Sequence, residues 1–123
     1  MLKFNITDNT GIKTIICIKI LGCSNTNNNI SVGNIIIGVV KELVPKRKIQ
    51  NNALVKSEII KAIVVRTCKE FKRKNGFIIR YDDNAAVIID SYGNPKGTKI
   101  FGIIPFELRI FSKKIISLSS TIL

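Results

Sequence analysis

A basic segment in the middle of the chain holds the residues whose types and spacing suit chemistry with phosphates. It runs from Arg66 to Lys74, contains a single acid, Glu70, and is followed by the pair Asn75-Gly76. Arginine and lysine bind phosphate oxygens through charge-assisted hydrogen bonds, and a planar guanidinium can make two such bonds to one phosphate. The segment therefore predicts binding to a phosphate-rich partner through its cations, which are Arg66, Lys69, Lys72, Arg73 and Lys74.

Further cations extend this prediction. Lys46, Arg47 and Lys48 follow the end of an expected strand, and Arg80 is expected on the strand face opposite Ile79. In a neutral protein such clusters would be ordinary solvated surface. This chain has a net charge of +12 over 123 residues and a pI near 10.0, and self-repulsion of that size favours a polyanionic partner. We therefore expect these cations to contact nucleic acid.

The acidic residues offer no comparable catalytic or metal site. Asp82 and Asp83 are the only adjacent acids, they would point to opposite faces of a strand, and turn formation suits them better. The chain has no histidine, and its three cysteines lack the paired spacing of a zinc site. Segment 93–98 is not a phosphate-binding loop, because Pro95 removes an amide donor. We expect no enzyme, no metal and no cofactor.

Charged residues also limit the expected cellular setting. Lysines interrupt every isoleucine-rich run before the ~18 residues that a membrane span needs. The first residues, from Met1 to Asp8, lack the apolar segment of a signal peptide. We therefore expect no membrane partner, and a protein that works in the compartment where it is made. The odd set of three cysteines, Cys17, Cys23 and Cys68, adds the expectation that this compartment is reducing.

Short strands are expected to position the basic segment. Runs rich in β-branched residues, bounded by turn-forming residues, predict a single-domain barrel or sandwich with strands at 13–21, 34–43, 59–66, 77–81 and 85–89. Gly38 predicts a bulge or a barrel corner, and Asn75-Gly76 predicts a two-residue hairpin turn. A further extended segment is expected at 98–101. Pro105 is expected to open a helical turn, whereas the tail from Lys113 fits either a helix or a strand.

The aromatic residues decide the expected mode of binding. Two tyrosines and six phenylalanines are scattered along the chain, and tryptophan is absent. A single-strand-binding face would stack successive bases on aromatic side chains, and an RNA-recognition motif would need paired aromatic motifs. Folded RNA, recognised through its shape and backbone, is therefore the favoured partner. The alternative is a free-standing barrel that binds single-stranded nucleic acid as a chaperone or regulator.

The stretch from Ala62 to Ile88 resembles the signature of the large-subunit ribosomal protein fourteen family, the universal L-fourteen family. That signature is a small residue, three aliphatics, a basic stretch, Asp/Asn-Gly, an aromatic, an Asn and an aliphatic pair. This chain matches it at Ala62, Ile63-Val64-Val65, Asn75-Gly76, Tyr81, Asn84 and Val87-Ile88. Similar segments extend the resemblance over the chain, at 8–11, 17–22, 97–102, 107–109 and 114–118.

The resemblance implies a mainly β fold, with a small five-stranded antiparallel barrel, a protruding basic ribbon and a short helical C-terminal region at about 103–123. It also implies a structural constituent of the large ribosomal subunit. Such a protein binds large-subunit rRNA, contacts ribosomal protein nineteen and contributes to bridges with small-subunit rRNA. Family members also dock a ribosome-silencing factor, on a surface that corresponds here to Thr98, Lys99 and Lys114.

Residue usage and local motifs resemble those of plastid members of the family. Ile, Asn and Lys dominate the composition, and all three are encoded by codons rich in A and T. Segments 66–70, 79–85 and 93–97 are most similar to plastid versions. The resemblance therefore implies an organelle-encoded protein of an apicoplast or another AT-rich, non-photosynthetic plastid. Four segments depart from the family: 46–57 is longer, 25–29 lacks the usual basic residues, and 105–106 and 119–123 also differ.

Overall fold

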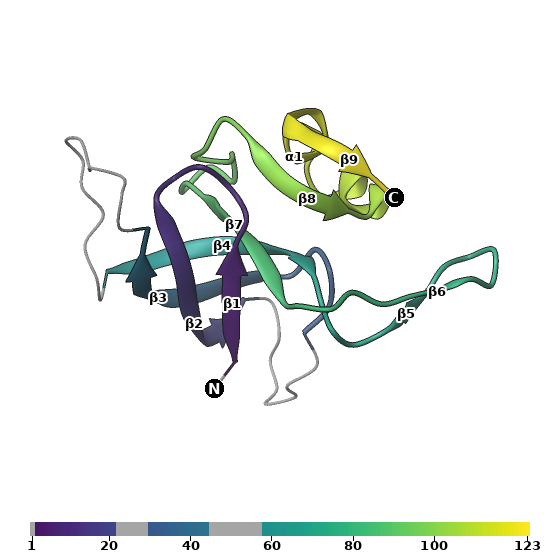
Figure 1. Cartoon of the computed structure of the whole chain (residues 1–123), viewed down its shortest axis with the longest axis horizontal. Helices are drawn as coiled ribbons and strands as arrows, with labels where there is room; N and C mark the ends of the chain where they lie inside the picture. Colours follow the sequence, from purple (N-terminus) through teal and green to yellow (C-terminus); the bar gives the residue numbers. More distant parts are fainter. Residues whose placement is uncertain (1, 22–29, 45–57) are drawn as a thin grey trace.

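Five strands close into a barrel at the centre of the computed structural model, which describes residues 2–21, 30–44 and 58–123 (Figure 1). Neighbouring strands are antiparallel, and a parallel pairing of the first strand with the last closes the ring. The predicted five-stranded barrel is therefore confirmed, with the correction that one pairing is parallel. In the order of pairing, the strands are β1 (Lys3–Ile6), β2 (Ile12–Ile20), β3 (Ile35–Leu43), β4 (Ile59–Arg66) and β7 (Ala85–Ile89).

Alternation along β4 and β7 divides the interior into two cores. Successive side chains of a strand point to opposite faces. Ala62 and Val64 of β4 therefore face the barrel interior, where they pack with Phe4 and other apolar residues of β1, β2 and β3. Ile63 and Val65 face outward and belong to a second core, together with residues from the end of the chain. Both faces of β4 and β7 are covered, which explains their nearly continuous apolar sequences.

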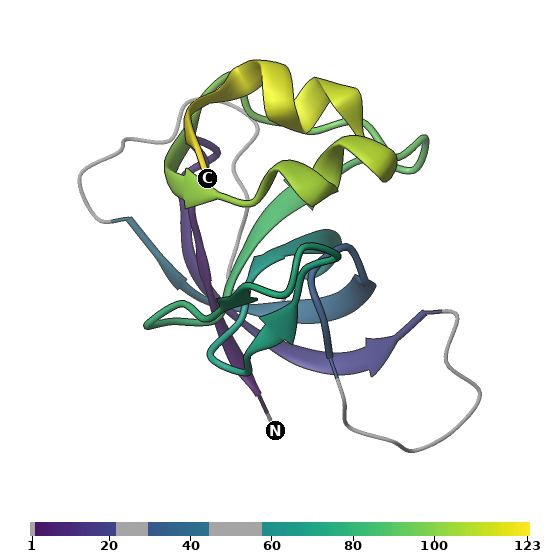
Figure 2. The ribbon, with the colours of Figure 1, turned by 90° about the vertical axis from the view of Figure 1, so that its right-hand side faces the viewer.

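The C-terminal unit, residues 100–123, covers the outer face of β4 and β7, and it lies above the barrel in both ribbon views (Figures 1 and 2). Ile104, Leu108 and Ile115 have no exposed surface and form the centre of the second core. Burying one such side chain stabilises a fold by roughly 1.5–3 kcal/mol, so the unit is held firmly against the barrel. Its elements are β8 (Ile100–Ile104), the 3-10 helix η1 (Phe106–Ile110), α1 (Lys113–Leu118) and β9 (Ser119–Ile122).

The tail from Lys113, for which the sequence fitted either a helix or a strand, contains one of each. A helix, α1, comes first, with Ser112 as its N-cap: the hydroxyl accepts from the amide of Ile115 at 3.4 Å. The strand β9 follows and pairs in parallel with β8. Pro105 precedes η1 from an extended backbone, so it caps the turn and does not occupy its first helical position as predicted.

The basic ribbon, residues 67–84, leaves the barrel after β4 and returns to it at β7 (Figure 1). Its paired strands are β5 (Phe71–Lys72) and β6 (Ile78–Ile79). The amide of Gly76 donates to the Arg73 carbonyl at 3.0 Å, and the amide of Arg73 donates to the Phe77 carbonyl at 2.8 Å. With Gly76 at φ 93°, this is a three-residue loop closed by a glycine bulge. The two-residue turn that was predicted at this point is wrong.

The identity of the fifth barrel strand also differs from the sequence prediction. The expected strand 77–81 does not join the barrel, because its paired residues, Ile78–Ile79, pair within the ribbon. The barrel position belongs to β1, where Asn5 lies between Thr14 and Ala85. The other expected strands agree with β2, β3, β4 and β7 to within one residue. The segment expected at 98–101 begins later, as β8.

Gly38 marks a barrel irregularity, as expected, but the irregularity lies on the opposite strand. The register shifts between Cys17 and Lys19 of β2, across from Gly38. A Cβ atom on Gly38 would lie 2.9 Å from the carbonyl oxygen of Ile16. The glycine therefore allows the two strands to approach closely at this point.

Gly33 allows the C-terminal unit to approach the barrel closely. Its φ is 95°, and its amide donates to the carbonyl of Val64 at 2.9 Å. A Cβ atom here would overlap the ring of Phe111. We expect Gly33→Ala to lower the free energy of unfolding by about 2 kcal/mol, because it strains the backbone and displaces this ring. Urea denaturation measures the loss.

The matched control for this substitution is Gly76→Ala. Gly76 has nearly the same backbone angle, with φ 93°, and no described atom lies within 4 Å of the added Cβ. Backbone strain alone is then expected to cost about 1 kcal/mol. Equal losses in the two variants would show that contact with Phe111 does not matter.

Candidate nucleic-acid interface

Three cations of the ribbon are free to meet an external partner. Lys72 lies in β5, Lys74 lies in the turn and Arg80 follows β6. All three are exposed, and none has an ion-pair partner within residues 2–21, 30–44 and 58–123. Their charge is therefore directed into solvent, where phosphates can approach it. Lys69 is also exposed and precedes β5.

Arg73 differs, because its guanidinium is held within the protein. Its Nε lies 2.6 Å from Oε2 of Glu107, and its Nη2 donates to Oε1 of the same carboxylate and to the carbonyl of Leu123, each at 3.1 Å. The guanidinium carbon also lies 4.7 Å from the centre of the Phe106 ring, within the range of a cation–π contact. The side chain is only 14% exposed. Arg73 therefore joins the ribbon to the C-terminal unit.

Arg66 is held in a similar way at the end of β4. Its Nε and Nη2 donate to the two carboxylate oxygens of Asp83, at 3.0 and 3.4 Å. Its Nη1 donates to the carbonyl of Ile103 at 3.1 Å and to that of Phe101 at 3.5 Å. Gly102, at φ 83°, leaves the space that this guanidinium occupies. Arg66 therefore fixes the base of the ribbon to β8, and Asp83 is its ion-pair partner as well as a turn residue.

The hydroxyl of Tyr81 is buried beside these charged groups. It has no hydrogen-bond partner in the described part of the chain. Burial raises the pKa of the Tyr81 phenol, while the charges of Arg73, Glu107 and Arg66 act on it in opposing directions. The hydroxyl thus loses its hydration without a compensating bond.

Replacing Tyr81 with phenylalanine is therefore expected to cost no stability. Removing a buried donor that has no partner relieves a desolvation penalty, so the free energy of unfolding is expected to rise by up to about 1 kcal/mol. Thermal and urea unfolding measure the change. A loss of stability would show that the hydroxyl does have a bonding partner in solution.

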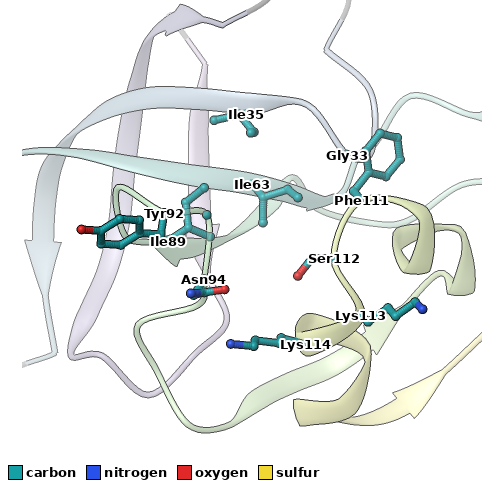
Figure 3. Close-up of a pocket in the computed structure, with 11 residues that line it drawn as sticks. Gly33, Ile35, Ile63, Ile89, Tyr92, Asn94, Phe111, Ser112, Lys113 and Lys114 are labelled. Carbon is teal, nitrogen blue, oxygen red and sulfur yellow. The ribbon is translucent and has the colours of Figure 1, made fainter.

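A surface hollow of about 470 Å³ lies between the barrel and the start of α1 (Figure 3). Its floor is aliphatic, with Ile63 and Ile89, and Figure 3 shows Lys113 and Lys114 pointing in opposite directions at its edge. No acid, histidine or cysteine is among the lining residues. Its polar side chains are those of Tyr92, Asn94, Ser112 and the two lysines.

The described part of the chain contains no group of three or more His, Cys, Asp or Glu residues that could hold a metal ion. Cys17 is buried in β2 and Cys68 is exposed. No helix in the same part of the chain is long and apolar enough to cross a membrane. The predicted cations Lys46, Arg47 and Lys48 lie outside the described residues, as does Cys23.

Comparison with models of protein families shows to which family this chain belongs. The family model described as "Ribosomal protein L14p/L23e" matches residues 2–123. The chain belongs to the L14p/L23e family. The resemblance seen in the sequence is therefore confirmed over nearly the whole chain. Members of this family are structural proteins of the large ribosomal subunit and not enzymes, so this L14p/L23e protein works in the ribosome, in association with large-subunit rRNA.

The residues of the silencing-factor surface predicted for this L14p/L23e protein lie in two separate segments, the loop before β8 and the helix α1. Thr98 and Lys99 precede β8 and are fixed by Asn9, whose Oδ1 accepts from their amides at 2.9 and 3.3 Å. Lys114 belongs to α1 and lines the hollow, whereas Thr98 and Lys99 do not. All three side chains are exposed.

Several residues that fix this interface escaped the sequence analysis. Asp8 is buried, and burial raises the pKa of its carboxyl despite hydrogen bonds from Thr10 and Ile88. One of these bonds comes from the amide of Ile88 at 3.1 Å, which ties the 8–11 turn to β7. The available signal was the Asp-Asn pair that opens this turn, because both side chains readily bond to nearby amides. Glu107 gave no such local signal, and Asp83 was predicted as a turn residue but not as the partner of Arg66.

Proposed function

We propose that this L14p/L23e protein binds large-subunit rRNA through the exposed cations of its ribbon. Lys72, Lys74 and Arg80 carry this proposal, because they lie on the ribbon, are exposed and have no ion-pair partner in the described residues. Neutralising phosphates with such side chains releases condensed counterions, which gives binding that weakens steeply with salt. The protein then acts as a fixed positive surface that stabilises one local arrangement of folded rRNA.

The phosphate contacts are proposed at the free cations and not at Arg66 and Arg73. Both of those guanidinium groups already bond to carboxylates and carbonyls of the protein. Lys69 is proposed as a contact at the base of the ribbon. The same role is proposed for Lys46, Arg47 and Lys48 on the basis of their charge alone.

Further partners are proposed from the family resemblance. They are small-subunit rRNA at intersubunit bridges, ribosomal protein nineteen and a ribosome-silencing factor. The exposure of Thr98, Lys99 and Lys114 supports a docking surface for the last of these. The Ile, Asn and Lys bias and the plastid-like motifs support a location in an AT-rich plastid, either an apicoplast or another non-photosynthetic plastid.

Sedimentation of a lysate through a sucrose gradient tests this function against its alternative. We expect nearly all of the protein to sediment with large subunits and whole ribosomes. A predominant pool near the top of the gradient would instead support a free-standing barrel that binds single-stranded nucleic acid.

A further inference from the structure

We infer that Arg73 is a positioning residue, which fixes the ribbon against the C-terminal unit so that its free cations meet RNA in one orientation. This inference rests on the proposed RNA-binding function and explains how the ribbon performs it. Charge and position in the sequence suggested that Arg73 would contact phosphate directly. The contacts of its guanidinium point to an indirect role.

The ribbon needs an external support because its own pairing is minimal. Each of its paired strands, β5 and β6, is two residues long. An isolated two-stranded hairpin is at best marginally stable in water. Phe77 and Ile78 are exposed, at 68% and 60%, so these side chains bury little surface that could hold the ribbon in place.

Arg73 supplies this support from the middle of the basic sequence. Two separate parts of the C-terminal unit meet at its guanidinium: η1, through the Phe106 ring and the Glu107 carboxylate, and Leu123, through its main-chain oxygen. Lys72 is the last residue of β5, and Arg73 directly follows it. The Arg73 side chain lies against the C-terminal unit, whereas the Lys72 side chain is exposed to solvent.

Loss of Glu107 is expected to change RNA affinity in the direction opposite to that of a simple charge effect. It is an acid beside a surface that is proposed to bind a polyanion, so a purely electrostatic account predicts that its loss strengthens RNA binding. If Glu107 instead holds Arg73, and through it the ribbon, its loss weakens RNA binding even though a negative charge has been removed. The two accounts therefore predict opposite changes in affinity.

The experiment measures the affinity of purified Glu107→Gln and Arg73→Gln proteins for a large-subunit rRNA fragment that binds the wild-type protein, at several salt concentrations. Each variant is expected to bind about tenfold more weakly. This loss follows if the released ribbon adopts the orientation that binds RNA only about a tenth of the time. The dependence on salt is expected to stay the same, because no phosphate contact is lost. Lys74→Gln, by contrast, is expected to reduce the salt slope by about 0.7–0.9.

Glu70→Gln is the matched control for charge. Glu70 is an exposed acid in the ribbon, and its substitution removes the same charge without touching the Arg73 site. We expect this variant to bind RNA as well as or better than the wild type. If Glu107→Gln behaves like Glu70→Gln, the positioning role is overturned. A wild-type protein that binds no rRNA fragment would refute the proposed function itself.

Amide hydrogen exchange provides a second readout that needs no RNA. The Arg73 amide bonds to the Phe77 carbonyl across the ribbon, and the Val64 amide bonds to the Asn34 carbonyl within the barrel region. In Glu107→Gln we expect exchange at Arg73 to become about tenfold faster and exchange at Val64 to stay unchanged. Unchanged exchange at Arg73 would overturn the inference, and faster exchange at both sites would do so as well, since it would indicate general unfolding.

Discussion

Arg66→Ala is expected to lower the free energy of unfolding by about 3 kcal/mol, the largest stability effect that we predict. The substitution leaves the Asp83 carboxylate without its cation and removes the donor shared by the carbonyls of Phe101 and Ile103. The estimate is at the low end for a buried pair because the Asp83 side chain is 35% exposed. The midpoint of thermal unfolding is expected to fall by roughly 10 °C for a domain of this size.

Two variants separate the bonding of Arg66 from its charge. Arg80→Ala removes an exposed arginine without a described ion-pair partner, so it is expected to change stability by less than about 0.5 kcal/mol. Arg66→Lys keeps the charge but not the planar fork, and we expect it to recover less than half of the loss. An Arg66→Ala protein as stable as Arg80→Ala would contradict the proposed link between β4, the ribbon and β8.

Neutralising the ribbon is expected to have the largest effect on RNA binding. In a protein that carries Lys72→Gln, Lys74→Gln and Arg80→Gln, the slope of log affinity against log salt concentration is expected to become shallower by about 2 to 3. At moderate ionic strength the affinity for large-subunit rRNA is expected to fall by about 100-fold or more. Filter binding or fluorescence anisotropy over a salt series measures both quantities.

A matched triple variant tests whether position matters as well as charge. Lys13, Lys19 and Lys41 are exposed on β2 and β3, and their replacement by glutamine removes the same total charge. Two of these lysines, Lys13 and Lys41, lie near Glu42, and the pKa of the Glu42 carboxyl is lowered by a hydrogen bond from Thr14 and further by these lysines.

We expect the variant with Lys13, Lys19 and Lys41 replaced to lose far less RNA affinity than the ribbon variant. Equal losses would show that net charge, and not the ribbon, controls binding.

Local sequence was sufficient to predict the central strands. β4 and β7 coincide with the predicted strands because each is an unbroken apolar run whose two faces are buried in different cores. β1 was not predicted, because it has four residues and only Phe4 is buried. Its pairing with β7 joins residues such as Asn5 and Ala85, which are distant in the sequence. Local patterns carry little information about such long-range pairing.

The sequence predicted where the candidate site lies, but not which of its cations face solvent and which are bound within the protein. The sequence identified the basic ribbon and its Asn-Gly turn. It did not show that Arg66 and Arg73 are bound internally, because their carboxylate partners lie 17 and 34 residues away. Charge alone does not distinguish a cation that contacts phosphate from one that holds the site in shape. The three-dimensional positions of Asp83 and Glu107 make this distinction.

The most direct test of the central claim is a cross-link from the ribbon within assembled large subunits. Phe77 lies beside the turn and is 68% exposed, so a photoreactive phenylalanine analogue fits this position with little disturbance. After irradiation of purified subunits, we predict that this residue becomes attached to large-subunit rRNA. Subunits that contain the protein but yield no cross-link to rRNA from this position would contradict the claim that the ribbon is the RNA-binding element.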